Sequence, residues 1–341
     1  MSGVSANTVP KSLLWATDYD VLPADHLVEH RDGYLIVRSP GNPAHWWGNL
    51  LLFDDAPESG DGERWERLFE LEFGEEPRVE HVTLAWDRID GALGSAREEF
   101  VSRGYELEET VGLVAKPEAL RIHPRADRDV VIRELDPLPG GDQDFWEQAI
   151  ELQVASRDEF LEEQVYREFI GRRLEDLRVL FRAGGGAWYV ATYPGDDDVV
   201  AACGIVVTGE RGRFQAVDTA AAYRRRGISS RLVVEAADRA AKRGVTRFVI
   251  AADPGYHALG LYESLGFARV ERVARIFTAM AGHFGEQFCM RPLVVNGAPG
   301  LLLDTGEYPS VIAFSIDRGR INEIDVVRNP EKLGTLLGSG R

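Results

Sequence analysis

The sequence predicts an α/β protein built on mixed β-sheet, with two α/β halves and a strand-rich tail. Three observations predict this class. Strand and helix patterns alternate over 130–278, an order that gives right-handed crossovers onto a central mixed sheet. A shorter series of strands and helices runs through 33–115, and apolar alternation after 290 indicates an antiparallel meander. At about 100–200 residues per domain, 341 residues leave room for two or three domains.

Changes in composition place the domain boundaries. Residues 1–12 are small and polar, so we expect them to be disordered. A first domain follows over 13–120, and the basic, proline-containing segment 116–128 serves as a linker. The second domain spans 129–278. The segment 279–341 has a different pattern and forms a partial third domain.

In the first half, helix signals separate strand-like apolar runs. Gly74 is a plausible C-cap for the first helix, and Ser95 with Glu98 gives the second an N-terminal capping signal. The predicted order is strands over 33–38 and 47–53, a helix over 65–73, a strand over 80–86, a helix over 95–103, and one or two strands over 105–115.

The second half repeats this alternation with clearer periodicity. Apolar residues recur at three- and four-residue steps in each predicted helix. The predicted order is a strand over 130–135, helices over 144–155 and 159–180, a hairpin of 187–193 with 199–208, a strand over 214–219, a helix over 230–242, a strand over 247–252, a helix over 258–265 and a strand over 267–277.

Composition excludes several classes of protein. The formal net charge of −17 disfavours general nucleic-acid binding, which needs a basic excess. Two cysteines cannot form a disulfide scaffold, and the seven histidines show no metal-ligand spacing, so no metal is expected. No run approaches the ~18 apolar residues of a membrane span. We therefore expect a cytoplasmic protein that binds neither membranes nor nucleic acids.

The residues between 217 and 232 carry the first chemical signal. A strand ends at Val217-Asp218-Thr219, a glycine-containing basic turn follows, and an amphipathic helix begins. The first N–H groups of a helix lack internal partners, and with the helix dipole they suit a pyrophosphate. The turn and helix start comprise Arg224, Arg225, Arg226, Gly227, Ile228, Ser229 and Ser230. Alone, this pattern also fits a solvated basic turn that caps an ordinary helix.

A second motif follows after the next strand. Leu261-Tyr262-Glu263-Ser264-Leu265-Gly266-Phe267, together with the Arg-x-x-Gly-x-Ser turn, resembles the GCN5-related N-acetyltransferase (GNAT) superfamily over about 130–278. The resemblance implies that the turn binds the pyrophosphate of acetyl-CoA. It also implies that the strand end at 217–219 offers backbone groups to the pantetheine arm. Tyr262 would protonate the leaving thiolate, and acetyl-CoA is the expected co-substrate.

The general base is not assigned. Where family members often have an asparagine seven residues before the tyrosine, this chain has Gly255. The carboxylate that some members place on the strand before the turn corresponds to Arg213. Asp218 and Asp253 are nearby alternatives. A base acting through water, or no base for an amine that arrives neutral, is equally open.

The other two parts of the chain also show resemblances. The first half lacks the Arg-x-x-Gly turn, yet its element order is similar to a degenerate acetyltransferase domain, which would make this a tandem protein. An unrelated α+β substrate domain is the alternative. The tail, in 294–300 and 324–333, is similar to the SnoaL-like (NTF2-like) domain of extracytoplasmic-function sigma factors. Half such a sheet would need to pack on the acetyltransferase, on a second copy as a homodimer, or on a partner.

These observations favour an N-acetyltransferase that moves an acetyl group to a primary amine by direct attack. The alternative is an acetyl-CoA-binding sensor or regulatory module without turnover, whose tail engages a partner. The acceptor, a small molecule or a peptide amine, is not identified by the sequence. The acidic balance favours cationic acceptors, such as polyamines, through long-range steering.

Overall fold

The structure, a computed structural model, describes residues 10–76, 78–158, 161–279, 289–295, 298–304, 310–317 and 320–327. The chain forms two compact units, Met1–Thr278 and Ala279–Arg341. The described strands of the first unit form one 11-stranded sheet, and those of the second form a four-stranded sheet.

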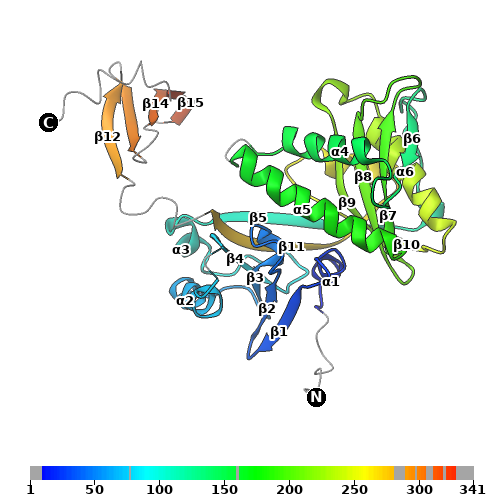
Figure 1. Cartoon of the computed structure of the whole chain (residues 1–341). Coiled ribbons are helices and arrows are strands. Elements are labelled where there is room, and N and C mark those ends of the chain that lie inside the picture. Colours follow the sequence, from blue (N-terminus) through cyan, green and yellow to red (C-terminus); the bar gives the residue numbers. More distant parts are fainter. Residues whose placement is uncertain are drawn as a thin grey trace. The chain divides into compact units, whose positions relative to one another are not determined.

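The first unit has two halves, each built of strands and covering helices (Figure 1). The first half supplies α1 (Leu13–Tyr19), β1 (Leu27–Arg31), β2 (Tyr34–Arg38), β3 (Leu50–Phe53), α2 (Asp61–Phe73), β4 (His81–Trp86), α3 (Arg97–Ser102) and β5 (Glu106–Ala115). The second half supplies β6 (Val131–Glu134), α4 (Gln143–Ala155), α5 (Glu163–Arg182), β7 (Gly186–Thr192), β8 (Ala201–Thr208), β9 (Arg211–Thr219), α6 (Ile228–Ala241), β10 (Arg247–Ala252), α7 (Ala258–Leu265) and β11 (Ala268–Ala279). The mixed α/β class predicted from the sequence is confirmed.

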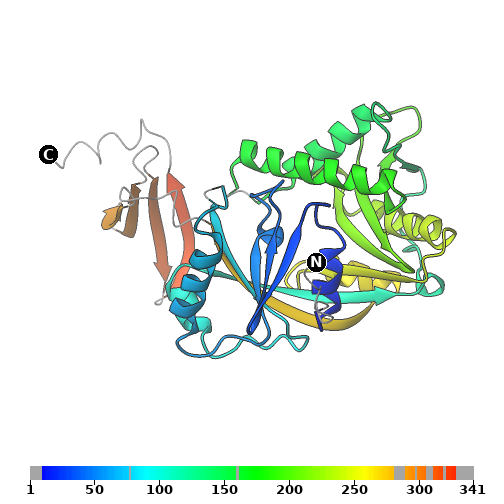
Figure 2. The same cartoon turned by 60° about the horizontal axis from the view of Figure 1, so that its bottom comes forward.

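The two halves exchange their last strands. The sheet order is β1-β2-β3-β4-β11-β5-β10-β9-β8-β7-β6. Thus β5 of the first half pairs antiparallel with β10 and β11 of the second half, and β11 lies between β4 and β5. Figures 1 and 2 show β5 and β11 running side by side across both halves. Because each strand's backbone groups are hydrogen-bonded to the other half, the halves form one continuous sheet.

Alternate residues of the second half's strands point to two separate cores. Ala187 and Tyr189 pack with α6 and α7 on one face, whereas Trp188 and Val190 pack with α4 and α5 on the other. This alternation follows from the two-residue period of a strand. The sheet is therefore covered by helices on both faces, and its central strands are buried, as Figure 1 shows for α4 to α6.

The first half is covered in the same way, by α2 and α3 on one face and by α1 on the other. The sequence analysis gave no helix for 13–19. Leu14 and Trp15 of α1 are buried against β2 and β3 and against Val249 of β10. The short helix α1 therefore packs over both halves.

Long-range hydrogen bonds hold the start of α1. The Asp87 carboxylate accepts from the N–H groups of Lys11 and Ser12 at 2.7 and 2.9 Å. The Glu271 carboxylate, from β11, accepts from the Ser12 hydroxyl at 2.9 Å and from the first two N–H groups of the helix. These bonds satisfy donors that a helix start leaves open. Residues 11 and 12 are thus ordered, in contrast to the disorder expected for 1–12.

The segment 116–128, which we expected to be a linker, is packed against the second half. The Arg121 N–H donates to the Leu265 carbonyl at 2.9 Å, and the His123 N–H donates to the Ser230 hydroxyl at 2.8 Å. The segment therefore lies along the end of α7 and the start of α6.

The second unit is an antiparallel meander in the order β12-β13-β14-β15. Its strands are β12 (Cys289–Val295), β13 (Ala298–Asp304), β14 (Ser310–Asp317) and β15 (Arg320–Val327). The predicted meander is confirmed. The SnoaL-like resemblance, part of which rests on residues outside those described, stays a prediction.

His81 on β4 leads to a prediction about acid stability. Its side chain is buried, and its Nε2 lies 3.2 Å from the Asn49 carbonyl. Burial lowers the pKa of His81 from 6.5 to about 4, although the hydrogen bond to Asn49 acts the other way. As pH falls from 6.5 towards 4, the unfolded state binds a proton at this residue before the folded state does. The free energy of unfolding should therefore fall over this range by roughly 1 kcal/mol per pH unit from His81.

The measurement is urea denaturation of the wild type and His81→Gln at pH 7 and at about pH 4.5. Glutamine keeps an N–H donor for Asn49 but does not titrate, so the variant should lose less stability on acidification. His30→Gln, at an exposed position on β1, is the control and should behave like the wild type. If His81→Gln and the wild type lose the same stability on acidification, then His81 is not a source of the acid sensitivity.

Candidate functional site

The candidate site begins where two parallel strands of the second half separate. β9 and β10 pair only at Arg211–Arg213 with Arg247–Val249. Beyond this point β10 continues against β5 to Ala252, and β9 continues against β8 to Thr219. The β8–β9 register shifts in this stretch, and Ala216 has a positive φ of 46°. The last residues of β9 therefore have backbone groups that β10 does not bind.

The basic turn leads directly into the N-terminus of α6. Gly227 is the N-cap, in the left-handed region at φ 76°, and Arg225 also has a positive φ of 64°. The Arg231 N–H donates to the Gly227 carbonyl at 3.3 Å, which makes this the first turn of the helix. The N–H groups of residues 228–230 come before this first helical bond. They have no acceptor within the helix, because the residues four positions earlier lie outside it. With the helix dipole, they make the start of α6 suited to an anion.

The structure brings the end of β9 and the start of α6 together. The hydroxyl oxygens of Thr219 and Ser229 lie 2.6 Å apart. Arg224 donates from Nε to the Thr219 carbonyl at 3.0 Å. Asp218 accepts from the Ser156 hydroxyl and from the Thr219 N–H, so its carboxylate faces the end of α4. Val217 is partly buried on the same strand end.

Two residues predicted to bind the cofactor have side chains that face away from the turn. Ile228 is buried in the core, and the Ser230 hydroxyl accepts from the His123 N–H. Only their backbone N–H groups are available to an anion. The Arg226 guanidinium stacks on the Tyr223 ring at 5.0 Å, and Arg225 is exposed.

Gly227 is required by a contact that the sequence analysis missed. A Cβ at this position would lie 2.6 Å from the Ala126 Cα, and the positive φ also disfavours other residues. The Asp127 N–H next to this contact donates to the Arg226 carbonyl at 2.9 Å. The segment 116–128 therefore fixes the turn from the outside.

Tyr262 lies on α7 within the core of the second half. Its ring centroid is 6.1 Å from that of Phe267, and the side chain is 5% exposed. Burial raises the pKa of the Tyr262 phenol well above its ordinary value, and the Asp218 carboxylate raises it further. The phenol is therefore protonated at neutral pH and can act as a proton donor.

The carboxylates considered as general bases have other partners. Asp253 is exposed and accepts from the Gly255 N–H at 2.6 Å, which closes a turn before α7. Burial raises the pKa of the Asp218 carboxyl, although the hydrogen bonds from Ser156 and Thr219 act the other way. Arg213 occupies the strand position where a base was sought.

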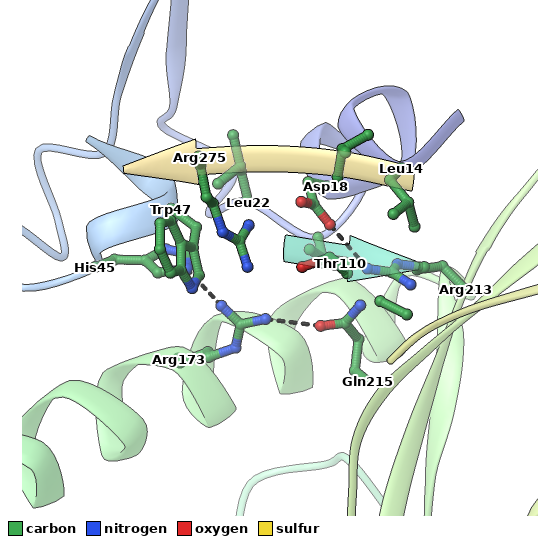
Figure 3. Close-up of a pocket in the computed structure, with 13 residues that line it drawn as sticks. Leu14, Asp18, Leu22, His45, Trp47, Thr110, Arg173, Arg213, Gln215 and Arg275 are labelled. Carbon is green, nitrogen blue, oxygen red and sulfur yellow. Dashed lines mark hydrogen bonds and ion pairs between the residues drawn. The ribbon is translucent and has the colours of Figure 1, made fainter. Parts of the chain in front are cut away.

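A polar cavity of about 130 Å³ lies where β9 and β10 separate (Figure 3). Both halves line it. The first half contributes residues of α1 and β5 and the loop before β3, and the second half contributes residues of α5, β9, β10 and β11. The lining residues are Leu14, Asp18, Val21, Leu22, His45, Trp47, Thr110, Arg173, Arg213, Gln215, Ala251, Val273 and Arg275. Local sequence patterns do not predict this set, because its members come from segments far apart in the chain.

Neither a metal centre nor a membrane span is found in the part of the chain that the structure describes. No group of three or more histidine, cysteine, aspartate or glutamate residues there is arranged to hold a metal ion. Likewise, none of the helices in these residues is long and apolar enough to cross a membrane.

Comparison with protein families finds one match. Residues 146–267 match the acetyltransferase (GNAT) family. This segment includes the end of β9, the basic turn, α6 and Tyr262. A comparison with curated proteins finds no match.

Comparison with solved structures finds many similar chains. A conserved protein of unknown function from Staphylococcus epidermidis has a TM-score of 0.56 at 14% identity, over 75% of this chain and 95% of that chain. A GCN5-related N-acetyltransferase from Sphaerobacter thermophilus has a TM-score of 0.46 at 16% identity, over 72% and 80%. A tandem GNAT protein from the clavulanic acid biosynthesis pathway has a TM-score of 0.48 at 11% identity, over 80% and 90%.

The family match covers the elements that build the candidate site, and their order is the one expected for that family. Residues 146–267, which contain the candidate site, thus match the acetyltransferase (GNAT) family.

Proposed function

We propose that the protein transfers an acetyl group from acetyl-CoA to an amine. The observation that carries this proposal is the start of α6, with N–H groups suited to an anion, beside the separation of β9 and β10. The site lies within the segment that matches the acetyltransferase family. That family generally uses acetyl-CoA, and the donors present fit its pyrophosphate.

The residues then have distinct roles. The N–H groups of 228–230 and the arginines of the turn bind the pyrophosphate. The backbone of Val217 and Thr219, at the end of β9, binds the pantetheine arm. The amine nitrogen bonds to the thioester carbonyl carbon as the carbon–sulfur bond breaks. Tyr262 donates its proton to the departing sulfur, and the proton of the former amine leaves to solvent.

A second candidate function is an acetyl-CoA-binding sensor without turnover. The absence of an assigned general base favours the sensor. Arg213 stands at the strand position considered for a base, and the carboxylates of Asp253 and Asp218 already accept hydrogen bonds. Release of free thiol from acetyl-CoA in the presence of a panel of amines separates the two functions. Turnover with any amine supports the transferase, and tight binding without turnover supports the sensor.

The first prediction tests the anion site through Ser229, in the first turn of α6. Ser229→Asp adds a negative charge beside the proposed pyrophosphate site, and an acidic residue in the first turn also favours the helix itself. Acetyl-CoA should stabilise the wild type thermally, by about 2.7 kcal/mol at a hundred times Kd. We expect this stabilisation to be lost in Ser229→Asp, as measured by differential scanning fluorimetry.

Ser229→Asn is the matched control, because it has the same shape as aspartate without the charge. It should keep most of the thermal shift. Gly227 is unsuitable for this test, since any Cβ there would meet Ala126. A full acetyl-CoA shift in a folded Ser229→Asp protein would mean that the start of α6 is not the pyrophosphate site.

The second prediction concerns Tyr262. Tyr262→Phe removes only the hydroxyl group, which acts as the thiolate leaves, so kcat should fall while the affinity for acetyl-CoA stays the same. General acid catalysis contributes typically about 10²–10⁴-fold, so a loss of this order is expected. Steady-state kinetics measure kcat, and a binding titration measures the affinity for acetyl-CoA.

Tyr256→Phe is the control, because Tyr256 is 49% exposed in the loop before α7. It should leave kcat close to the wild-type value. If Tyr262→Phe also leaves kcat unchanged while the chemical step limits the rate, then Tyr262 has only a packing role.

A further inference from the structure

The cavity at the separation of β9 and β10 combines a small volume with an excess of positive charge. Arg173, Arg213 and Arg275 line it, and Asp18 is the carboxylate among the lining residues. Figure 3 shows the three guanidinium groups facing one another across it, with Thr110 and Gln215 nearby. The lining is thus strongly basic in a chain whose formal net charge is −17.

Two of these arginines are buried and have N–H groups for which the described part of the chain provides no hydrogen-bond acceptor. Arg213 is 6% exposed and donates from Nη2 to Asp18 at 2.9 Å, whereas its Nε and Nη1 have no partner there. Arg275 is 8% exposed and donates from Nη2 to Glu108, whereas its Nε has no partner there. Buried N–H groups of this kind are costly unless an acceptor meets them.

Neighbouring side chains hold the arginines in position. The Arg275 guanidinium lies 3.5 Å from the centroid of the Trp47 ring. Arg173 donates from Nη2 to the Gln215 side chain at 2.7 Å, and its Nη1 lies 2.6 Å from Nε2 of His45. Because Arg173 can only donate, this His45 nitrogen is the acceptor. Burial, reinforced by the charge of Arg173, lowers the pKa of His45 well below its usual value, so the ring is neutral.

The position of the cavity connects it with the proposed chemistry. Arg213 is the last residue of β9 that pairs with β10, and Gln215 and Ala251 line the cavity just beyond that point. The same strand ends at the residues proposed to hold the pantetheine arm. Arg213 is also close enough to Tyr262 to influence its pKa. The cavity is therefore placed to receive the acceptor beside the thioester.

We propose that the cavity binds an anionic group of the acceptor, so that the substrate is a small amine bearing a carboxylate or a phosphate. This inference rests on the proposed acetyltransferase function. The unpartnered donors of Arg213 and Arg275 bind the anion, while Asp18 attracts the ammonium form of the amine. A volume of about 130 Å³ is equivalent to roughly four water molecules, which suits one small charged group. Long cationic amines, favoured by the net charge, do not fit this lining.

The test compares matched amines that differ in the anionic group. Glycine is compared with glycinamide, and phosphoethanolamine with ethanolamine, with spermidine as the cationic probe. Two measurements are made on the full chain: kcat/KM for acetylation, and thermal stabilisation by each amine without acetyl-CoA. We expect at least one amine with an anionic group to stabilise the protein and to exceed its partner without that group in kcat/KM by about 10-fold or more. The two pairs distinguish a carboxylate from a phosphate.

Arg213→Gln should reduce the preference for the anionic amine by about 10- to 100-fold, as expected for losing a hydrogen bond to a charged group. Arg211→Gln is the matched control. Arg211 pairs with Asp20 of the same α1 segment but does not line the cavity, so this variant should keep the preference. Arg275→Gln, on a different strand, provides a second test if Arg213→Gln fails to fold.

The outcomes separate this inference from the proposed function. Faster acetylation of glycinamide, ethanolamine or spermidine would overturn the inference but support the acetyltransferase. An unchanged anionic preference in folded Arg213→Gln and Arg275→Gln would also overturn it. Stabilisation by glycine or phosphoethanolamine that Arg213→Gln removes, with no turnover of any amine, would support the anion site and contradict the acetyltransferase. No stabilisation and no preference by any anionic amine would overturn the inference.

Discussion

The exchange of β5 and β11 is the constraint on which the first unit depends. β5 pairs with β10 and β11, and β11 lies between β4 and β5. Neither half could separate without breaking these ladders and exposing their backbone groups. The same two strands carry Thr110 and Arg275 to the cavity. The proposed acceptor pocket is therefore completed by the exchange, and the second half alone would lack the wall that β5 supplies.

How far the sequence could predict the structure depends on whether the information is local. The turn at Gly227 and the helix at Tyr262 were found because their signals lie within a few residues. Helix α1 was missed because Asp87 and Glu271, far away in the chain, satisfy its first N–H groups. Strand exchange is not predicted, because the alternation of apolar and polar residues indicates a strand but not the strand with which it pairs. The cavity was missed for the same reason, since seven segments contribute to it.

The overall composition and the lining of the cavity point to different acceptors. A net charge of −17 describes the average over the chain, and it led to the expectation of a cationic amine. Many carboxylates are paired with arginines, as in the pairs of Arg38 with Glu72 and Arg243 with Glu134. In the cavity the balance is reversed, because three arginines face a single aspartate. Recognition of a small substrate depends on this local charge, since distant exposed charges are screened by salt.

The proposed acceptor cavity would give the first half a role that does not require a cofactor site of its own. Asp18 of α1 pairs with Arg213 at 2.9 Å, and His45, from the loop before β3, is 2.6 Å from Arg173. Each contact joins a residue of the first half to an arginine of the second half inside the cavity. Without the first half, Arg213 would lose its carboxylate partner and Arg173 would lose its contact with His45. If the cavity receives the acceptor, both halves select the substrate: the second half supplies the three arginines, and the first half supplies Asp18 and the contacts of His45 and Trp47 that position two of the arginines.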